Sequence, residues 1–321
     1  MLIFDFKITI IFISFRDIMS NFQQIALIGP TASGKSDLAI EVAQNNNAHI
    51  LSLDSLAIYK EINIASAKPR IEDREGVQHF GIDVIFPDEP FDVTTFIKLY
   101  QNAKKEAIKD KKNLVIVGGT SFYLNTLING ISQLPTISDK AKEKSNILLK
   151  DLKEAHHFLY EKDKQYLQTI TTHDRYRIEK MLNLYFETNM TPTEYFKLNR
   201  PKPTIDTDLP IYEIIVDRDI LAKRIKKRTL KMIKCGLIDE VFYLEKNYTR
   251  LPNSMKAIGI KEVLNYLDGR YTKMEMKNQI ITHTTQLAKR QRTFNNSRFK
   301  NKIALPLEEL SPYLLDQRLF A

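Results

Sequence analysis

A run of eight residues near the N-terminus has the types and spacing of a phosphate-binding loop. The run reads GPTASGKS and fits the pattern G-x-x-x-x-G-K-[ST], with its members at Gly29, Pro30, Thr31, Ala32, Ser33, Gly34, Lys35 and Ser36. Its glycines let successive backbone N–H groups turn inward, Lys35 can reach the outer phosphates, and the Ser36 hydroxyl can ligate Mg²⁺. The run therefore predicts binding of a diphosphate or triphosphate with Mg²⁺, without specifying the reaction.

The acidic partner of this loop is in an unusual place. A P-loop NTPase commonly carries an aspartate at the end of another strand, for Mg²⁺ and water. Here the apolar run 113–117 is followed by Gly118, Gly119 and Thr120, none of which is acidic. The acid comes instead as Asp54, after the run 49–53, and should lie at the carboxyl end of the sheet. By itself Asp54 could cap a helix or hold magnesium.

The elements that must position these residues alternate along the first third of the chain. Short apolar runs predict buried parallel strands, and the longer patterns between them predict helices. The predicted strands are 24–28, 49–53, 113–117 and 211–216, and the predicted helices are 36–44 and 91–110. This alternation predicts an α/β fold, with a P-loop-type parallel sheet flanked by helices.

The segment 138–199 differs from the rest because it is polar, helical in pattern and free of strand-like runs. We interpret it as an all-helical insertion domain. The catalytic core would then comprise 19–137 and 200–321, with mostly helical structure after residue 217. The apolar residues 1–18 are too short to span a bilayer and contain charges, so we expect a non-native or disordered N-terminal extension.

The positive charge is concentrated in one part of the chain. The formal net charge of the whole sequence is +9. Residues 220–300 contain 19 Lys plus Arg and 6 Asp plus Glu, a net of +13, so the remainder is slightly acidic. Such a block fits either solvated helix faces or an electrostatic surface for nucleic acid.

Four further motifs give the sequence a specific resemblance. They are DSLAIYK at 54–60, ASAKP at 65–69, VGGT at 117–120 and QLAKRQ at 286–291. With the P-loop, and in this order, they resemble the tRNA dimethylallyltransferase family. The resemblance extends from about residue 25 to residue 294.

The resemblance implies transfer of a dimethylallyl group from its diphosphate to N6 of adenine 37, next to the tRNA anticodon, with Mg²⁺ required. By position in the motifs, Asp54 is the family's general base and Thr31 contacts substrate. Thr120 follows a Gly-Gly turn at a strand end, a position that suits the lip of the substrate channel. Arg224 and Arg228 are four residues apart and share a helix face. The resemblance implies that they reach the diphosphate, although a solvated basic helix would have the same pattern.

The same resemblance implies a set of tRNA contacts. Several of these positions carry Lys where the family often has Arg, which keeps the charge but loses bidentate geometry; solvent exposure alone would also account for each of these lysines. The implied tRNA-binding residues are Asp54, Ser55, Leu56, Ala57, Lys142, Tyr176, Arg177, Ile178, Glu179, Lys180, Lys256, Gly259 and Lys261.

Three alternatives remain open from the sequence. A P-loop kinase of a small metabolite would turn over ATP but has no use for the basic block. A prenyltransferase acting on free adenine nucleotides would need neither that block nor the insertion. A non-enzymatic RNA-binding protein would leave the P-loop unexplained. We expect a cytoplasmic monomer that binds dimethylallyl diphosphate and a tRNA anticodon stem-loop, and no membrane.

Overall fold

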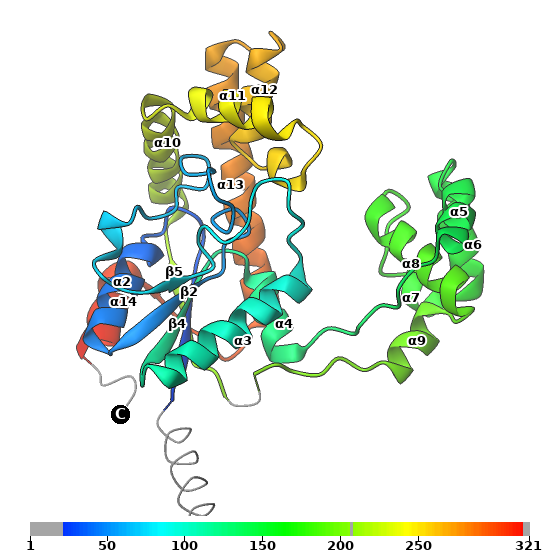
Figure 1. The fold of residues 1–321 in the computed structure, drawn as a ribbon, viewed down its shortest axis with the longest axis horizontal. Helices are drawn as coiled ribbons and strands as arrows, with labels where there is room; N and C mark the ends of the chain where they lie inside the picture. Colours follow the sequence, from blue (N-terminus) through cyan, green and yellow to red (C-terminus); the bar gives the residue numbers. More distant parts are fainter. Residues whose placement is uncertain (1–21, 206–207, 317–321) are drawn as a thin grey trace, which may run out of the picture. The chain divides into compact units, whose positions relative to one another are not determined.

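The computed structural model describes residues 22–205 and 208–316 (Figure 1). The predicted extension at 1–18 lies outside these residues. The chain divides into two compact units, one comprising Met1–Asn125 with Thr207–Ala321 and the other Thr126–Asp206. Among the described helices, none is both long and apolar enough to cross a membrane.

The first unit is built on a six-stranded sheet in which all strand pairs are parallel. The strand order is β3-β2-β4-β1-β5-β6. The strands are β1 (Gln24–Ile28), β2 (Ala48–Ser52), β3 (His79–Phe80), β4 (Asn113–Gly118), β5 (Ile211–Ile215) and β6 (Ile303–Pro306). The predicted α/β class and parallel sheet are confirmed. The two edge strands were not predicted from the sequence, because β3 has only two residues and β6 has only four and ends in proline.

The two faces of the sheet bury alternate residues of each strand. On one face Leu27 and Ile214 pack against Leu38 of α2 (Lys35–Asn45) and Leu310 of α14 (Leu307–Asp316). Figure 1 shows α2 and α14 together on that side.

The opposite face is covered by α3 (Val93–Lys109) and by the C-terminal part of α13 (Lys273–Arg298). The Tyr100 hydroxyl of α3 donates to Gln24 Oε1 at 2.9 Å, and Asn295 Nδ2 of α13 donates to Glu213 Oε1 at 2.7 Å. Burial on both faces explains why the central strands are mostly apolar and why the polar side chains Gln24 and Glu213 are hydrogen-bonded.

Four helices after β5 surround the loop that follows β2. They are α10 (Arg218–Lys234), α11 (Leu237–Tyr248), α12 (Ile260–Leu267) and α13. The short helix η1 (Glu72–Arg74) lies between β2 and β3, and η2 (Asn253–Lys256) lies between α11 and α12. Ile58 and Ile62 of the loop share a buried cluster with Leu244, Val263 and Ile280. This packing fixes the chain segment that begins at Asp54.

The second unit is helical. It contains α5 (Asp139–Leu148), α6 (Leu152–Lys162), α7 (Lys164–Leu167), α8 (Arg175–Thr188) and α9 (Pro192–Leu198), and α4 (Ser121–Asn129) runs across its boundary. The unit is wider than the segment 138–199. Its core includes Leu159, Leu167, Leu182 and the fully buried Ile178.

Candidate active site

A cavity of about 450 Å³ lies at the carboxyl ends of three strands. Thr31 follows β1, Asp54 follows β2 and Gly119 follows β4, and all three line it. Helices α10 and α13 supply further walls. Ligands bind at this edge of open parallel sheets. The cavity brings together these residues of the predicted site: Thr31, Lys35, Asp54, Ser55, Leu56, Thr120 and Arg228.

The loop between β1 and α2 curls because three of its residues, Gly29, Ala32 and Gly34, have positive φ. Gly34 has a φ of 96° and is the residue before α2, and Ala32 has a φ of 64°. A Cβ on Gly34 would lie 3.0 Å from the end of the flexible Leu307 side chain, so the preference for glycine comes from the positive φ. The loop is also held from α10, where Arg224 Nη1 donates to the Ser33 carbonyl at 3.2 Å. In this structure Arg224 thus supports the loop backbone.

Lys35 and Arg228 place two cations beside one carboxylate. Burial and the charge of Arg228 lower the pKa of Lys35 to about 8, and Asp54 opposes this shift. Burial likewise lowers the pKa of Arg228, again against the effect of Asp54. Buried cations that share one carboxylate favour binding of an anion, because the anion supplies the missing opposite charge.

The pKa of Lys35 gives a pH-dependent prediction. A value of about 8 means that Lys35 loses its proton between pH 7 and pH 9, whereas a diphosphate favours the charged form. Affinity for a diphosphate should therefore fall about tenfold from pH 7 to pH 9, because the fraction of Lys35 that carries the proton falls about tenfold across a pKa of about 8. Calorimetric titration of wild type and Lys35→Met separates this effect from ionisation of the ligand. Equal pH dependence in both proteins would contradict the prediction.

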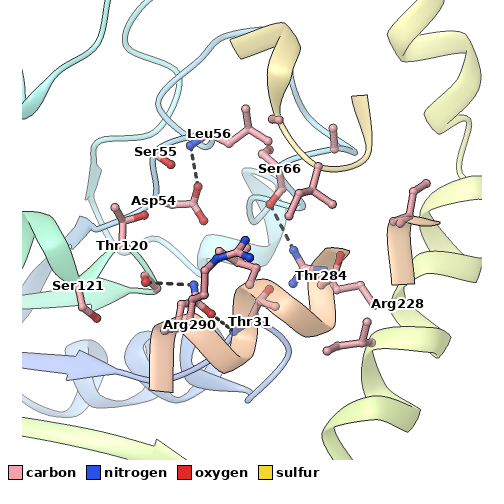
Figure 2. Close-up of a pocket in the computed structure, with 18 of the residues that line it drawn as sticks. Thr31, Asp54, Ser55, Leu56, Ser66, Thr120, Ser121, Arg228, Thr284 and Arg290 are labelled. Atoms are coloured by element: carbon pink, nitrogen blue, oxygen red, sulfur yellow. Dashed lines mark hydrogen bonds between the residues drawn. The ribbon is translucent and has the colours of Figure 1, made fainter. Parts of the chain in front are cut away.

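Asp54 sits in a turn that its own carboxylate stabilises. Its Oδ1 accepts hydrogen bonds from the N–H groups of Leu56 at 2.8 Å and Ala57 at 3.1 Å. Within the described residues, Oδ2 has no such partner in the protein. Figure 2 shows the carboxylate between Thr120 and Arg290, directed toward the cavity. Oδ1 thus holds the carboxylate in the turn, and Oδ2 is available to react with a ligand.

Arg228 reaches the cavity from α10 and is anchored on the loop after β2. Its Nη2 donates to the Ser66 carbonyl at 3.4 Å (Figure 2). That loop is held by Glu240 of α11, whose carboxylate accepts from the N–H groups of Asn63, Ile64 and Ala65 at 2.7–2.9 Å. Glu240 is a positioning residue that sequence reasoning missed, because nothing near it in the sequence indicates its partners.

Helix α13 contributes cavity residues that sequence reasoning did not assign. They are Ile280, Thr284, Leu287, Arg290, Gln291 and Phe294. The sequence contained a signal for this set, because positions 284, 287, 291 and 294 are spaced three or four residues apart and so lie on one helix face. The motif QLAKRQ indicated the helix but not which of its faces lines the cavity.

Other predicted residues lie elsewhere. Ser36 is exposed and lines a second cavity, of about 1130 Å³, which also contacts Arg228. Lys256 and Lys261 are exposed on either side of Ala257 and Ile258, which do line the first cavity. The loop behind the cavity wall comprises Gly29, Pro30, Ala32, Ser33 and Gly34. Gly259 does not line the cavity, and its N–H donates to Glu262 Oε2 at 2.6 Å.

The remaining predicted tRNA contacts are in the helical unit. Lys142 is exposed on α5, and Tyr176, Arg177 and Lys180 are exposed on α8. Glu179 is half-buried. Ile178 is fully buried in the core of the unit, so its side chain packs internally and is not available to RNA.

The residues fit a Mg²⁺ ion that arrives with a phosphate ligand better than a resident metal. Among the described residues, no group of three or more His, Cys, Asp or Glu side chains could hold a metal. Mg²⁺ is often bound through few protein ligands together with substrate phosphates. The exposed Ser36 hydroxyl, at the start of α2, is a suitable single ligand of that kind.

Comparison with known proteins gives one consistent result. The sequence model of the IPP transferase family matches residues 57–298. The tRNA dimethylallyltransferase of Sulfurovum sp. (strain NBC37-1) is 57% identical over 293 residues, which is 91% of this chain and 97% of that protein.

Two solved structures are also similar. A tRNA isopentenylpyrophosphate transferase from Staphylococcus epidermidis has a TM-score of 0.66 and 30% identity, covering 92% of this chain and 96% of its own. A eukaryotic dimethylallyltransferase acting on tRNA has a TM-score of 0.79 and 25% identity, covering 93% and 78% respectively.

Proposed function

The chain belongs to the tRNA dimethylallyltransferase family, and we propose that it transfers a dimethylallyl group from dimethylallyl diphosphate to N6 of adenine 37 in tRNA. The observation that carries this proposal is one cavity lined by a carboxylate, Asp54, and two half-buried cations, Lys35 and Arg228. A carboxylate suits an acceptor that must lose a proton, and the cations suit a leaving group that gains charge.

Asp54 acts on the acceptor side of the reaction. The lone pair of N6 is delocalised into the adenine ring, so the amine is a poor nucleophile. As the bond from N6 to the allylic carbon forms, the carboxylate oxygen that is not engaged in the turn takes the N6 proton. The bond from that carbon to the diphosphate oxygen breaks, and the electron pair leaves with the diphosphate.

Lys35, Arg228 and the N–H groups of the loop act on the donor side. They stabilise the negative charge that develops on diphosphate, and the loop is already held in place by Arg224 before the ligand arrives. Mg²⁺ bound at Ser36 would supply further charge neutralisation to the same phosphates.

The tRNA must present adenine 37 outside its stack, because a base within a stack cannot reach the cavity. Such extrusion costs a few kcal/mol, so contacts to the neighbouring nucleotides must compensate. Lys256 and Lys261 are exposed and flank the cavity residues Ala257 and Ile258, which suits contacts to backbone phosphates.

These two lysines give a salt-dependent prediction. The double variant Lys256→Ala/Lys261→Ala should bind tRNA more weakly, and the slope of log Kd against log salt should decrease by about one per lost phosphate contact. Binding titrations at several salt concentrations measure this slope. If the slope matches that of wild type, the two lysines face solvent in the complex.

A transfer assay tests the function directly. The protein is incubated with Mg²⁺, dimethylallyl diphosphate and unmodified tRNA, with AMP as a rival acceptor in a parallel reaction. We expect one dimethylallyl mass on the tRNA, at the adenine next to the anticodon, and none on AMP. Modification of AMP instead would favour the free-nucleotide prenyltransferase. Consumption of added ATP without any change in RNA mass would favour the kinase.

A further inference from the structure

Gln291 of α13 bridges the two sides of the cavity through its side-chain amide. Its Oε1 accepts from the Thr31 N–H at 3.0 Å, and its Nε2 donates to the Gly119 carbonyl at 3.0 Å. We propose that Gln291 is a positioning residue that fixes the separation between the diphosphate cradle and the base Asp54. This inference rests on the function proposed above.

The two ends of the bridge belong to different halves of the reaction. Thr31 is part of the loop that cradles the diphosphate. Gly119 precedes Thr120, whose N–H donates to the Leu53 carbonyl at 3.0 Å, and Leu53 immediately precedes Asp54. A continuous path of hydrogen bonds and backbone therefore links the cradle, through Gln291, to the segment that carries the base.

The chemistry of the bridge requires a primary amide of this length. A single planar group must accept a hydrogen bond at one end and donate one at the other. A glutamate could still accept from Thr31 but, when ionised, could not donate to the Gly119 carbonyl. A lysine could donate but not accept.

The bridge also requires glycine at position 119. A Cβ built on Gly119 would approach Gln291 Nε2 to well under 3.0 Å, closer than real Cβ contacts allow. Any larger residue at 119 would have to displace the amide. This close approach gives a specific reason for the second glycine of the VGGT motif.

The separation between the diphosphate cradle and Asp54 matters because both substrates must be held at reacting distance. Prenyl transfer needs the allylic carbon near N6 while N6 is near the carboxylate, and a shift of about 1 Å can reduce the rate by about 10²-fold. Loss of the bridge should affect alignment more than binding. Loss of the bridge should therefore decrease kcat with little change in KM for dimethylallyl diphosphate or in Kd for tRNA.

A double-mutant cycle on Gln291 and Gly119 tests the proposal. Gln291→Ala and Gly119→Ala should each lower kcat about 10- to 100-fold, because the first removes the amide and the second displaces it. Once the amide is absent, the room it leaves accepts the methyl group added at position 119. The double variant should therefore be no slower than Gln291→Ala, so the two effects should not multiply. Gln101→Ala, an exposed glutamine on α3, is the matched control and should have wild-type kcat.

Three results would overturn the proposal. The first is a kcat of Gln291→Ala within threefold of wild type, and the second is a loss of kcat in the double variant that equals the product of the two single losses. The third is a tenfold rise in the KM of Gln291→Ala for dimethylallyl diphosphate at unchanged kcat. If Gln291→Ala does not fold, as judged by thermal unfolding, Gln291→Glu replaces it. That variant retains the bond to Thr31 and should still lose kcat, and wild-type kcat in it would equally reject the bridge. If wild type itself does not prenylate tRNA, the proposed function fails instead, and the two failures are distinct.

Discussion

Asp54→Asn should reduce the single-turnover rate of prenyl transfer by about 10²- to 10⁴-fold, the usual contribution of a general base. Asparagine retains a carbonyl oxygen for the N–H groups of Leu56 and Ala57, so the turn that Asp54 stabilises should persist. What is lost is the second oxygen as a proton acceptor. Rapid-quench measurement of prenylated tRNA, with both substrates saturating, gives the rate.

Binding measurements distinguish chemistry from misfolding in this variant. The Kd for tRNA and the melting temperature of Asp54→Asn should stay close to wild type. The matched control is Asp88→Asn, which changes an exposed aspartate of the same unit and should leave the rate unchanged. A transfer rate within threefold of wild type would remove Asp54 from the role of base.

Arg228→Met should have the second largest effect and should act on the donor side. The half-buried guanidinium lines the cavity and donates a hydrogen bond to the Ser66 carbonyl. Removing one such preorganised donor commonly costs about 10²- to 10³-fold in kcat. We expect a loss of that size in steady-state assays, together with a higher KM for dimethylallyl diphosphate. Arg228→Lys should be intermediate, because lysine keeps the charge without the planar fork.

The neighbouring Lys227 provides the control. It is exposed one position earlier on α10, so Lys227→Met removes a charge from the same helix without opening the cavity. Its activity should match wild type. If Lys227→Met and Arg228→Met lost activity equally, the effect would come from helix charge and not from the cavity.

The sequence was most informative where the signal lies in consecutive residues. The strands β1, β2, β4 and β5 are continuous apolar runs, and each was predicted to within about one residue at its ends. The phosphate-binding loop was recognisable for the same reason, since its glycines, lysine and serine occupy one short segment. The edge strands β3 and β6 were missed because two to four residues are too few for a periodic pattern.

The site shows the limit of the same reasoning. Asp54, Lys35 and Arg228 were singled out as site residues from motifs, but their roles stay predictions until the variants are measured. The sequence did not indicate that Arg224 would hold the loop backbone at Ser33, or that Ile178 would be buried in the helical unit. Both outcomes depend on which way a side chain faces in a packed helix.

The sequence by itself determined the α/β class, the order of the motifs and hence the family, because local apolar patterns and short motifs record these directly. The tertiary structure decided which distant groups meet. Gln291 and Thr31 are 260 positions apart, and Arg228 and Ser66 are 162 apart. Periodicity indicates that a face is buried but not what it is buried against. The lowered pKa of Lys35 likewise arises only when folding buries the ammonium beside Arg228.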